Sequence, residues 1–428
     1  MKKITLFTAI LMVSNLLSAQ WIQQNTQFSD NLKETVFIDQ NNGWAIGGEE
    51  VTSIYFTTNG GLEWLGCFDL MDLPTHGCTI YFTDENNGWM SNGGGMGVGS
   101  EIWHTNNGEL GCNSEWELQL EAETDYISSK LFFIDPLHGW HVGYFDAGSD
   151  VYLSKFFYTI DGGSIWIEGD GLGYEVSDID FIDTQLGWAI DKKTEGIPGP
   201  SGLLHTVNGG EIWTSINDEI YGSAICFLDS QIGWIAGYDN TSSSGFISLT
   251  NDGGNNWVNQ TGVAIPAIHD ITFIDSMNGW AVGNEGTILH TADGGQNWEY
   301  QESGTLANLN SVCFIDQNYG WICGDSGIIL HTNNGGIVGI NENAMSKSKL
   351  NIHPNPSNET AAIIFELEQK GKITLSIINT KGQEVKQMNL GEQEKGQINL
   401  DCSNFSSGVY FINLQTEKGI LTEKLIIE

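Results

Sequence analysis

The sequence predicts an all-β protein, a seven-bladed β-propeller followed by a small immunoglobulin-like β-sandwich. Three observations favour this fold. The dipeptide Gly-Trp recurs seven times, with its Trp at positions 44, 89, 140, 188, 234, 280 and 321, and each repeat has room for four short strands. The chain holds 54 glycines and 7 prolines, which is typical of an all-β protein with many tight turns. No Trp follows the last repeat, and from residue 350 onward short runs alternate apolar and polar residues instead.

Composition and charge exclude several classes of protein. Acidic residues number 54 and basic residues 16, for a net charge of −38, and every basic residue is a lysine. A nucleic-acid-binding protein needs a basic surface, so we expect no nucleic-acid partner. Without arginine, the chain also has no bidentate clamp for carboxylate or phosphate groups.

Residues 1–20 read as a signal peptide. Lys2 and Lys3 precede an apolar stretch over 4–17, and small residues lead to a cleavage site after Ala19 or Gln20. The stretch is too short to span a bilayer as an anchor, and the sequence shows no other candidate transmembrane segment. We therefore expect an exported, monomeric protein that passes through the periplasm.

Each repeat carries two turn signatures. An Asp stands five residues before every Gly-Trp tryptophan, and downstream lies Thr-x-Asp/Asn-Gly-Gly-x-x-Trp. Asp and Asn side chains accept backbone N–H groups within such turns, so a structural role is predicted for this residue of the second signature. The residues concerned are Asn59, Asp161, Asn208, Asp252, Asp293 and Asn334.

The ring of blades is predicted to close through the N-terminus. The seventh repeat lacks its second Trp, while Trp21 stands 23 residues before Trp44, a spacing like that in the other repeats. Trp21 therefore begins an orphan fourth strand that would complete the last blade and remove open sheet edges. The predicted organisation is a propeller over 21–336, a linker over 337–349 and a second domain over 350–428.

The second signature resembles the Asp-box of sialidases, xyloglucanase-type glycoside hydrolases and the photosystem II stability/assembly factor family. The phrase from Gly279 to Trp298 looks most like the last of these. The resemblance implies the propeller fold and says little about activity. Sialidases bind their substrate through three arginines and the photosystem family docks through an arginine-rich patch, so neither role carries over to a chain without arginine.

Candidate functional residues lie on what we call the variable face, formed by the connections between the second and third strands of each blade and those between blades. These loops differ in length between repeats, as grafted binding surfaces do. Near the channel mouth we expect Glu34, Thr79, Lys130, Asp178, Ala224, Asp270 and Ser311, with Glu285 and Asp325 on two short loops nearby.

Asp178 and Asp270 form the candidate carboxylate pair for glycoside hydrolysis. The alternative for these acidic residues is a solvated rim or a weak calcium site. No other cofactor is expected.

Histidines and cysteines carry structural predictions. His104, His205, His290 and His331 share a strand position that Phe or Leu takes in other blades, which indicates packing instead of metal binding. In an exported chain disulfides are permitted. The sequence suggests a pair between Cys67 and Cys78, which flank one inter-blade connection, and a pair between Cys313 and Cys323, which would fall opposite each other across a hairpin. Cys112 lies in an insertion of the second repeat, and Cys226 is expected to be buried.

The C-terminal segment resembles the type A sorting domain of the type IX secretion system. The matching residues include Pro354, Asn355 and Pro356, then Gly408 and Tyr410, and finally Lys424. The resemblance implies the secretion machinery as a partner and export across the outer membrane of a Bacteroidota-type bacterium. It also implies removal of the domain and release, or attachment to surface lipopolysaccharide.

The leading functional hypothesis is non-catalytic binding of a glycan or protein ligand through the variable face. Constant turns, variable loops on the other face and the lack of a convergent catalytic set motivate it. The alternative is a glycoside hydrolase of the Asp-box propeller type that uses Asp178 and Asp270.

Overall fold

The structure is a computed structural model with two compact units, each described by itself. One comprises Ala19–Ile337, and the described residues of the other follow Ile337. Residues 1–19 of the predicted signal peptide and most of the predicted linker lie outside the described residues. The structure describes 20–26, 28–48, 52–67, 78–92, 99–124, 126–146, 152–170, 175–191, 202–239, 241–337, 349–379, 384–403, 405–416 and 419–427.

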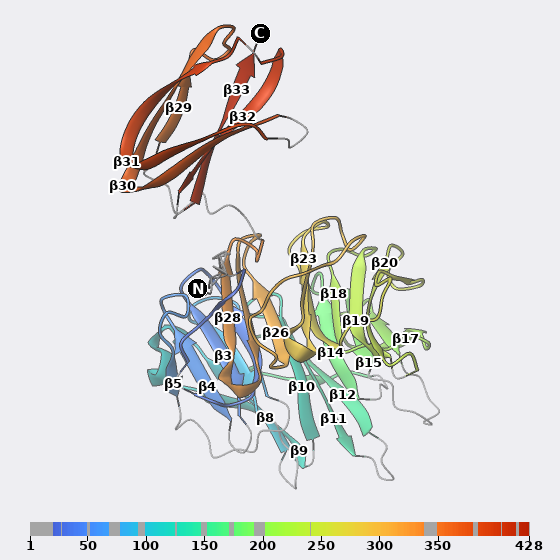
Figure 1. Cartoon of the computed structure of the whole chain (residues 1–428). Coiled ribbons are helices and arrows are strands. Elements are labelled where there is room, and N and C mark those ends of the chain that lie inside the picture. Colours follow the sequence, from blue (N-terminus) through green and yellow to red (C-terminus); the bar gives the residue numbers. More distant parts are fainter. Residues whose placement is uncertain are drawn as a thin grey trace, which may run out of the picture. The chain divides into compact units, whose positions relative to one another are not determined.

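The first unit consists of seven four-stranded antiparallel sheets (Figure 1). The innermost strand of each sheet contacts those of its two neighbours, and the last contacts the first, so the sheets form a closed ring of blades. The all-β propeller predicted from the sequence is thereby confirmed.

Six blades are built from consecutive strands, written here from the innermost outward. Blade 1 contains β2 (Leu32–Phe37), β3 (Gly43–Gly47), β4 (Ser53–Thr57) and β5 (Leu65–Cys67). Blade 2 contains β6 (Thr79–Phe82), β7 (Gly88–Ser91), β8 (Gly99–Thr105) and β9 (Glu117–Thr124). Blade 3 contains β10 (Tyr126–Phe133), β11 (Gly139–Asp146), β12 (Tyr152–Thr159) and β13 (Ile167–Glu168). Blade 4 contains β14 (Val176–Phe181), β15 (Gly187–Asp191), β16 (Leu203–Thr206) and β17 (Thr214–Asn217). Blade 5 contains β18 (Ala224–Phe227), β19 (Gly233–Asp239), β20 (Ser244–Thr250) and β21 (Val258–Asn259). Blade 6 contains β22 (Ile268–Phe273), β23 (Gly279–Gly283), β24 (Ile288–Thr291) and β25 (Glu299–Tyr300).

The seventh blade joins the two ends of the propeller. It contains β26 (Leu309–Phe314), β27 (Tyr319–Gly324), β28 (Ile329–Asn333) and, outermost, β1 (Ile22–Gln23). Ile22 pairs with His331, and buried Trp21 donates a hydrogen bond from Nε1 to Oε1 of Gln301 at 2.8 Å. The described loops include three short 3-10 helices, namely η1 (Gly108–Asn113), η2 (Asn284–Gly286) and η3 (Asp325–Gly327).

Aromatic stacking between neighbouring blades forms the core. The Trp of each Gly-Trp lies flat on a Phe of the next blade, with ring centroids 3.5–3.8 Å apart. This Phe always stands two residues before the repeat Asp. The seven pairs are Trp44–Phe82, Trp89–Phe133, Trp140–Phe181, Trp188–Phe227, Trp234–Phe273, Trp280–Phe314 and Trp321–Phe37. Stacked aromatic rings bury large apolar areas, so these pairs hold the blades together.

The same geometry explains the glycine that precedes each Trp. A Cβ on Gly279 would lie 2.5 Å from the ring of Phe273 in its own hairpin, and the six other copies show equivalent contacts. The Phe ring is therefore held between its own glycine and the Trp of the previous blade. The Trp Nε1 completes the joint in six blades by donating to an Asp-box glycine carbonyl of the next blade, as Trp140 does to Gly209 at 2.8 Å.

The repeat Asp closes the turn that leads to each Gly-Trp. Oδ1 of Asp39 accepts the backbone N–H groups of Asn41 and Asn42 at 2.6 and 2.8 Å. The six other copies make the same pair of bonds. Such Asx turns satisfy backbone donors that the hairpin leaves unpaired.

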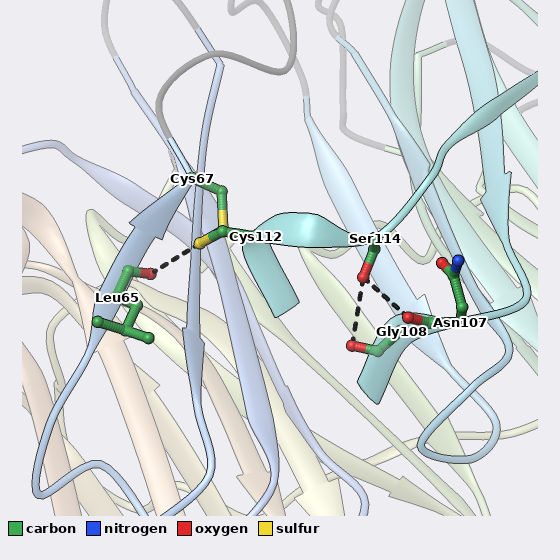
Figure 2. Close-up of a disulfide and its surroundings, with 6 residues drawn as sticks. All are labelled: Leu65, Cys67, Asn107, Gly108, Cys112 and Ser114. Atoms are coloured by element: carbon green, nitrogen blue, oxygen red, sulfur yellow. Dashed lines mark hydrogen bonds between the residues drawn. A yellow bond between two sulfur atoms is a disulfide. The ribbon is translucent and has the colours of Figure 1, made fainter. Parts of the chain in front are cut away.

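A disulfide joins Cys67 of β5 to Cys112 of η1 and so links blade 1 to blade 2 (Figure 2). Both suggested pairings are therefore wrong. The insertion in the second Asp-box carries Cys112 to within 4.8 Å of Cys67 between Cα atoms, while Cys78 is buried with a free thiol. Cys313 and Cys323 are also free. They lie opposite Trp321 and Ser311, respectively, and not opposite each other.

The second unit is a sandwich of five antiparallel strands. Its strands are β29 (Lys349–His353), β30 (Thr360–Asn379), β31 (Glu384–Asp401), β32 (Gly408–Thr416) and β33 (Gly419–Ile427). The pairing register of β30 with β31 shifts between Glu366 and Gly371, and apolar side chains of all five strands share one core. Asn355 fixes the segment after β29 to β33, because its side chain donates to the carbonyl of Lys424 and accepts the N–H of Ile426.

Replacing one stacked Phe tests the inter-blade joint. We expect Phe273→Ala to lower the free energy of unfolding by about 3–5 kcal/mol, because it leaves a cavity beside Trp234. Urea unfolding followed by Trp fluorescence measures this loss. Leu306→Ala, at a side chain that is 85% exposed, is the control and should change stability by less than about 0.5 kcal/mol. Similar losses in both variants would contradict the assignment.

The disulfide gives a second test. The denatured protein should show five free thiols, the number of free cysteines in the structure. Cys67→Ser should lower the free energy of unfolding by about 2–4 kcal/mol, because the unfolded chain loses a cross-link. Cys112→Ser and the double variant should lose the same amount, since each removes the same bond. Additive losses in the double variant would argue against this pairing.

Candidate functional site

The channel mouth gathers most of the predicted binding residues. The innermost strands place Glu34, Lys130, Asp178 and Asp270 around a cavity of about 240 Å³, together with Thr79 and Ser311. Ala224 is buried and does not line it. Because these residues occupy one equivalent position in successive blades, ring symmetry alone brings them together.

The carboxylates of this ring bind the backbone of the next blade. Glu34 accepts the N–H of Ile80 at 2.9 Å, Asp178 that of Ile225 at 2.9 Å, and Asp270 that of Val312 at 2.8 Å. The second oxygen of each aspartate accepts the N–H of the residue that follows it. The hydroxyls of Thr79 and Ser311 make the equivalent contact at 3.4 Å. These side chains therefore join neighbouring blades.

Lys130 is the cation among these carboxylates. Its Nζ lies 2.5 Å from Oε1 of Glu34 and 4.0 Å from Oδ1 of Asp178. Burial alone lowers the pKa of Lys130, but Glu34, Asp178 and Asp270 together raise it above its ordinary value. The lysine remains charged and offsets the negative charge at the channel mouth.

Burial raises the pKa of the neighbouring aspartates. It raises that of Asp178 to about 7 and that of Asp180, one layer deeper in the channel, to about 6. The pKa of Asp270 is raised for the same reason, although Lys130 opposes the shift. A carboxyl with a pKa near neutrality is a property of general acids.

The cavity at the channel mouth differs from a sugar-binding cleft. Among the described residues that line it, Tyr144 and His269 supply the aromatic rings. Glu285 and Asp325 lie outside this lining. Glu285 is exposed in η2, and the carboxylate of Asp325 in η3 accepts hydrogen bonds from the amides of Asn308 and Asn310.

A serine and a histidine meet in this region without forming an activated nucleophile. Ser128 lines the cavity, and its hydroxyl lies 3.0 Å from Nε2 of buried His141. Burial lowers the pKa of His141 to about 3, and its Nδ1 has no hydrogen-bond partner. A nucleophilic serine needs a basic histidine oriented by a third group. The pair is better explained as buried packing.

A larger groove lies on the variable face of blade 5, where no candidate residue was predicted. Its volume is about 590 Å³. Described residues of three segments line it: 219–221 between blades 4 and 5, 238–239 with 241–244 around the turn from β19 to β20, and 259–264 leading from blade 5 to blade 6. Tyr221, Tyr238 and Phe246 supply its aromatic rings. In the sequence, Tyr221 and Tyr238 lie at the ends of two loops of this face, and this pair could have indicated the groove.

The Asp-box residues bind within their own turns. Oδ1 of Asp252 accepts from the hydroxyl of Thr250 and the N–H of Asn256, and the Thr250 hydroxyl also accepts from Gly254. In the degenerate copy of blade 2, Asn107 accepts the same contact from the hydroxyl of Thr105. The five other predicted residues also share it, namely Asn59, Asp161, Asn208, Asp293 and Asn334. These side chains hold the turns that receive the Trp Nε1 groups.

The repeated histidines lie against the Gly-Trp tryptophans. His104, His205, His290 and His331 each pair across the hairpin with the Trp of their own blade, with ring centroids 4.7–5.2 Å apart. Burial lowers the pKa of all four, to about 4 in His331. They are therefore neutral packing residues near pH 7.

Metal and membrane sites were sought in the described part of the chain. Within it, no three His, Cys, Asp or Glu side chains are grouped to hold a metal ion. No helix there has the length and apolar character needed to cross a bilayer.

The charge cluster at the channel mouth predicts a pH dependence. Asp178 has a higher pKa in the folded than in the unfolded state, so its contribution to stability is full below about pH 4 and is lost as pH rises through about 7. Lys130→Met removes the cation that stabilises the ionised carboxylate of Asp178. We expect it to lower the free energy of unfolding by about 1–3 kcal/mol at neutral pH, with a much smaller effect near pH 4.

Urea unfolding of the two proteins at both pH values measures this difference. Lys155→Met is the control, because Lys155 faces the half-exposed Glu168 at 3.6 Å instead of a ring of carboxylates. Its effect should be smaller and should depend less on pH. An equal pH dependence in the two variants would rule out a special role for Lys130.

Comparison with known families matches two parts of the chain. Residues 351–428 match the family model of the secretion system C-terminal sorting domain. Residues 259–340 match the model of the photosynthesis system II assembly factor YCF48. No curated protein sequence matches the chain.

Solved structures show the same propeller fold. YCF48 bound to D1 peptide has a TM-score of 0.55 and 17% identity, over 73% of this chain and 96% of that one. YCF48 from Cyanidioschyzon merolae has a TM-score of 0.55 and 16% identity, over 73% and 98%. The GH74 xyloglucanase from Xanthomonas campestris has a TM-score of 0.54 and 10% identity, over 81% of this chain and 59% of that enzyme. At these identities the likeness concerns the fold alone.

Both resemblances predicted from the sequence are confirmed by these matches. The chain joins an Asp-box propeller similar to YCF48 to a secretion system C-terminal sorting domain.

Proposed function

We propose that this protein is an exported, non-catalytic propeller that binds its ligand through the variable face. The observation that carries the proposal is the use of the channel carboxylates. Both oxygens of Asp178, and both of Asp270, accept backbone N–H groups. A catalytic pair must exchange protons with, or attack, a substrate between the two groups. Carboxylates that join blades are poorly placed for that task.

Export is proposed to follow the type IX route of a Bacteroidota-type bacterium. The match of residues 351–428 to a secretion system sorting domain supports it, together with the signal-like N-terminal sequence. On this route the secretion machinery recognises the C-terminal domain, which is then removed. The propeller is released or attached to surface lipopolysaccharide, where its variable face is open to extracellular ligands.

Glycoside hydrolysis is the second candidate, and one observation favours it. The pKa of Asp178 is raised to about 7 by burial, as a general acid requires. The likeness to a GH74 xyloglucanase adds little, because 10% identity carries the fold and not the catalytic residues. Binding without hydrolysis remains the better explanation of the hydrogen bonds made by the two aspartates.

An assay of reducing-end release separates the two candidates. The purified protein is incubated with plant, algal and host polysaccharides beside the Asp178→Asn and Asp270→Asn variants. We expect no release by any of the three proteins, and reduced stability in both variants because each loses a carboxylate oxygen that accepts a backbone N–H. Release by the wild type that disappears in both folded variants would make the protein a hydrolase.

A further inference from the structure

We propose that the groove on blade 5 is the ligand site and that it binds a neutral, hydroxyl-rich glycan. This inference rests on the proposed binding function and names the ligand class. The groove has a volume of about 590 Å³, within the range of small-ligand sites. It is open along the variable face, as a site for part of a longer polymer must be.

Extended strands create the groove. In blade 5, β19 and β20 are seven residues each, whereas in blade 6 the corresponding β23 and β24 have five and four. The outermost strand β21 has only two residues and pairs with Ser248 and Leu249 of β20. Closer to the loop, Gly245 of β20 is bridged to Ile265 of the connection to blade 6. Ser244, Phe246 and Ser248 alternate along one face of β20 and line the space that remains.

Aromatic rings give the groove its apolar contact area. Tyr238 is 45% exposed, and Tyr221 and Phe246 are partly exposed beside it. The hydroxyl of Tyr221 donates to the carbonyl of Asp218 at 2.8 Å, which fixes the ring. Rigid aromatic side chains offer large contact areas at a low cost in conformational entropy. The C–H faces of a pyranose ring are suited to such surfaces.

The polar lining consists mainly of hydrogen-bond acceptors. The hydroxyls of Thr241, Ser242, Ser244 and Thr261 already donate within the protein, to Asp239, to the Gly245 carbonyl and to Asn259. A hydroxyl that donates its hydrogen keeps acceptor lone pairs. These residues, together with Glu219, therefore present acceptors to a ligand rich in O–H donors.

Charge distinguishes a neutral glycan from the alternatives. The described lining contains Glu219 and Asp239 and no lysine or histidine, so an anionic polymer would be repelled. A basic peptide would need free carboxylates. The carboxylate of Asp239 is instead held by the backbone and hydroxyls of Thr241 and Ser242, and the hydrogen bonds from these two residues lower its pKa to about 2. Asp239 keeps its charge, but its oxygens already accept these hydrogen bonds, so it is poorly placed to pair directly with a cation. Glu219 is then the carboxylate of the described lining that is left for direct pairing, which favours an uncharged ligand.

Native affinity electrophoresis of the intact protein tests the assignment. Gels contain soluble β-glucan, xylan or galactomannan, with polygalacturonate as the anionic polymer. We expect retardation by at least one neutral polymer, at low and high salt alike. Tyr238→Ala should weaken the apparent affinity about tenfold or more, and Tyr238→Phe should preserve it because the ring remains. Gly262 lines the groove, and a Cβ there would meet no atom within 4 Å. Gly262→Trp should therefore be tolerated by the fold and should fill the groove with its indole ring.

The matched control is Tyr300→Ala. Tyr300 is a tyrosine with 57% exposure on the outer strand of blade 6, outside the groove, and its loss should leave binding unchanged. Retardation by no neutral polymer, or equal weakening by Tyr238→Ala and Tyr300→Ala, would overturn the glycan assignment.

Two further measurements separate a wrong glycan assignment from a wrong binding function. Binding of a fluorescent oligolysine peptide that is lost in Tyr238→Ala and abolished by salt would replace the glycan with a basic partner. The proposal of a binding propeller would then stand. Release of reducing ends from the same polysaccharides would instead contradict the non-catalytic function itself.

Discussion

The stacking of a Trp from one blade on a Phe of the next is the contact on which the propeller depends. Each such Phe lies between that Trp and the glycine of its own hairpin, where a Cβ has no room. The Trp also reaches the Asp-box of the next blade through Nε1 in six of the seven joints. Gly-Trp, Asp-box and Phe are therefore parts of one repeated joint. Because that joint uses the same residues in every blade, the loops of the other face are free to differ.

The repetition of the blades around a ring also explains why acidic residues at the channel mouth resemble a catalytic pair. Ring symmetry places the side chains of equivalent positions close together whatever they do. Their partners reveal their role: Asp178 and Asp270 bind backbone groups of the adjacent blade, as the uncharged Thr79 and Ser311 also do. Lys130 occupies the equivalent position in blade 3, and its ammonium group neutralises part of the resulting charge.

Sequence reasoning was strongest where a residue repeats. The blades, the turns and the packing of the histidines follow from residues that recur at fixed spacing, because local turn chemistry and strand alternation suffice to place them. It was weakest where contacts join distant segments. Cys112 reaches Cys67 through a unique insertion, and the groove on blade 5 requires three loops from two inter-blade connections and one hairpin. The Phe of each joint also recurs in all seven repeats, but its stacking partner lies in the neighbouring blade, which spacing within a repeat does not indicate.

Closure of the seventh blade by β1 has a consequence for the order of assembly. Ile22 pairs with His331, so β1 cannot pair until the last hairpin of the propeller has formed. Until both ends meet, β28 presents an unpaired edge that can capture a strand from another molecule. Contacts between such distant residues also form slowly. The greatest aggregation hazard in folding the propeller therefore lies at its final step, and it ends when β1 pairs with β28.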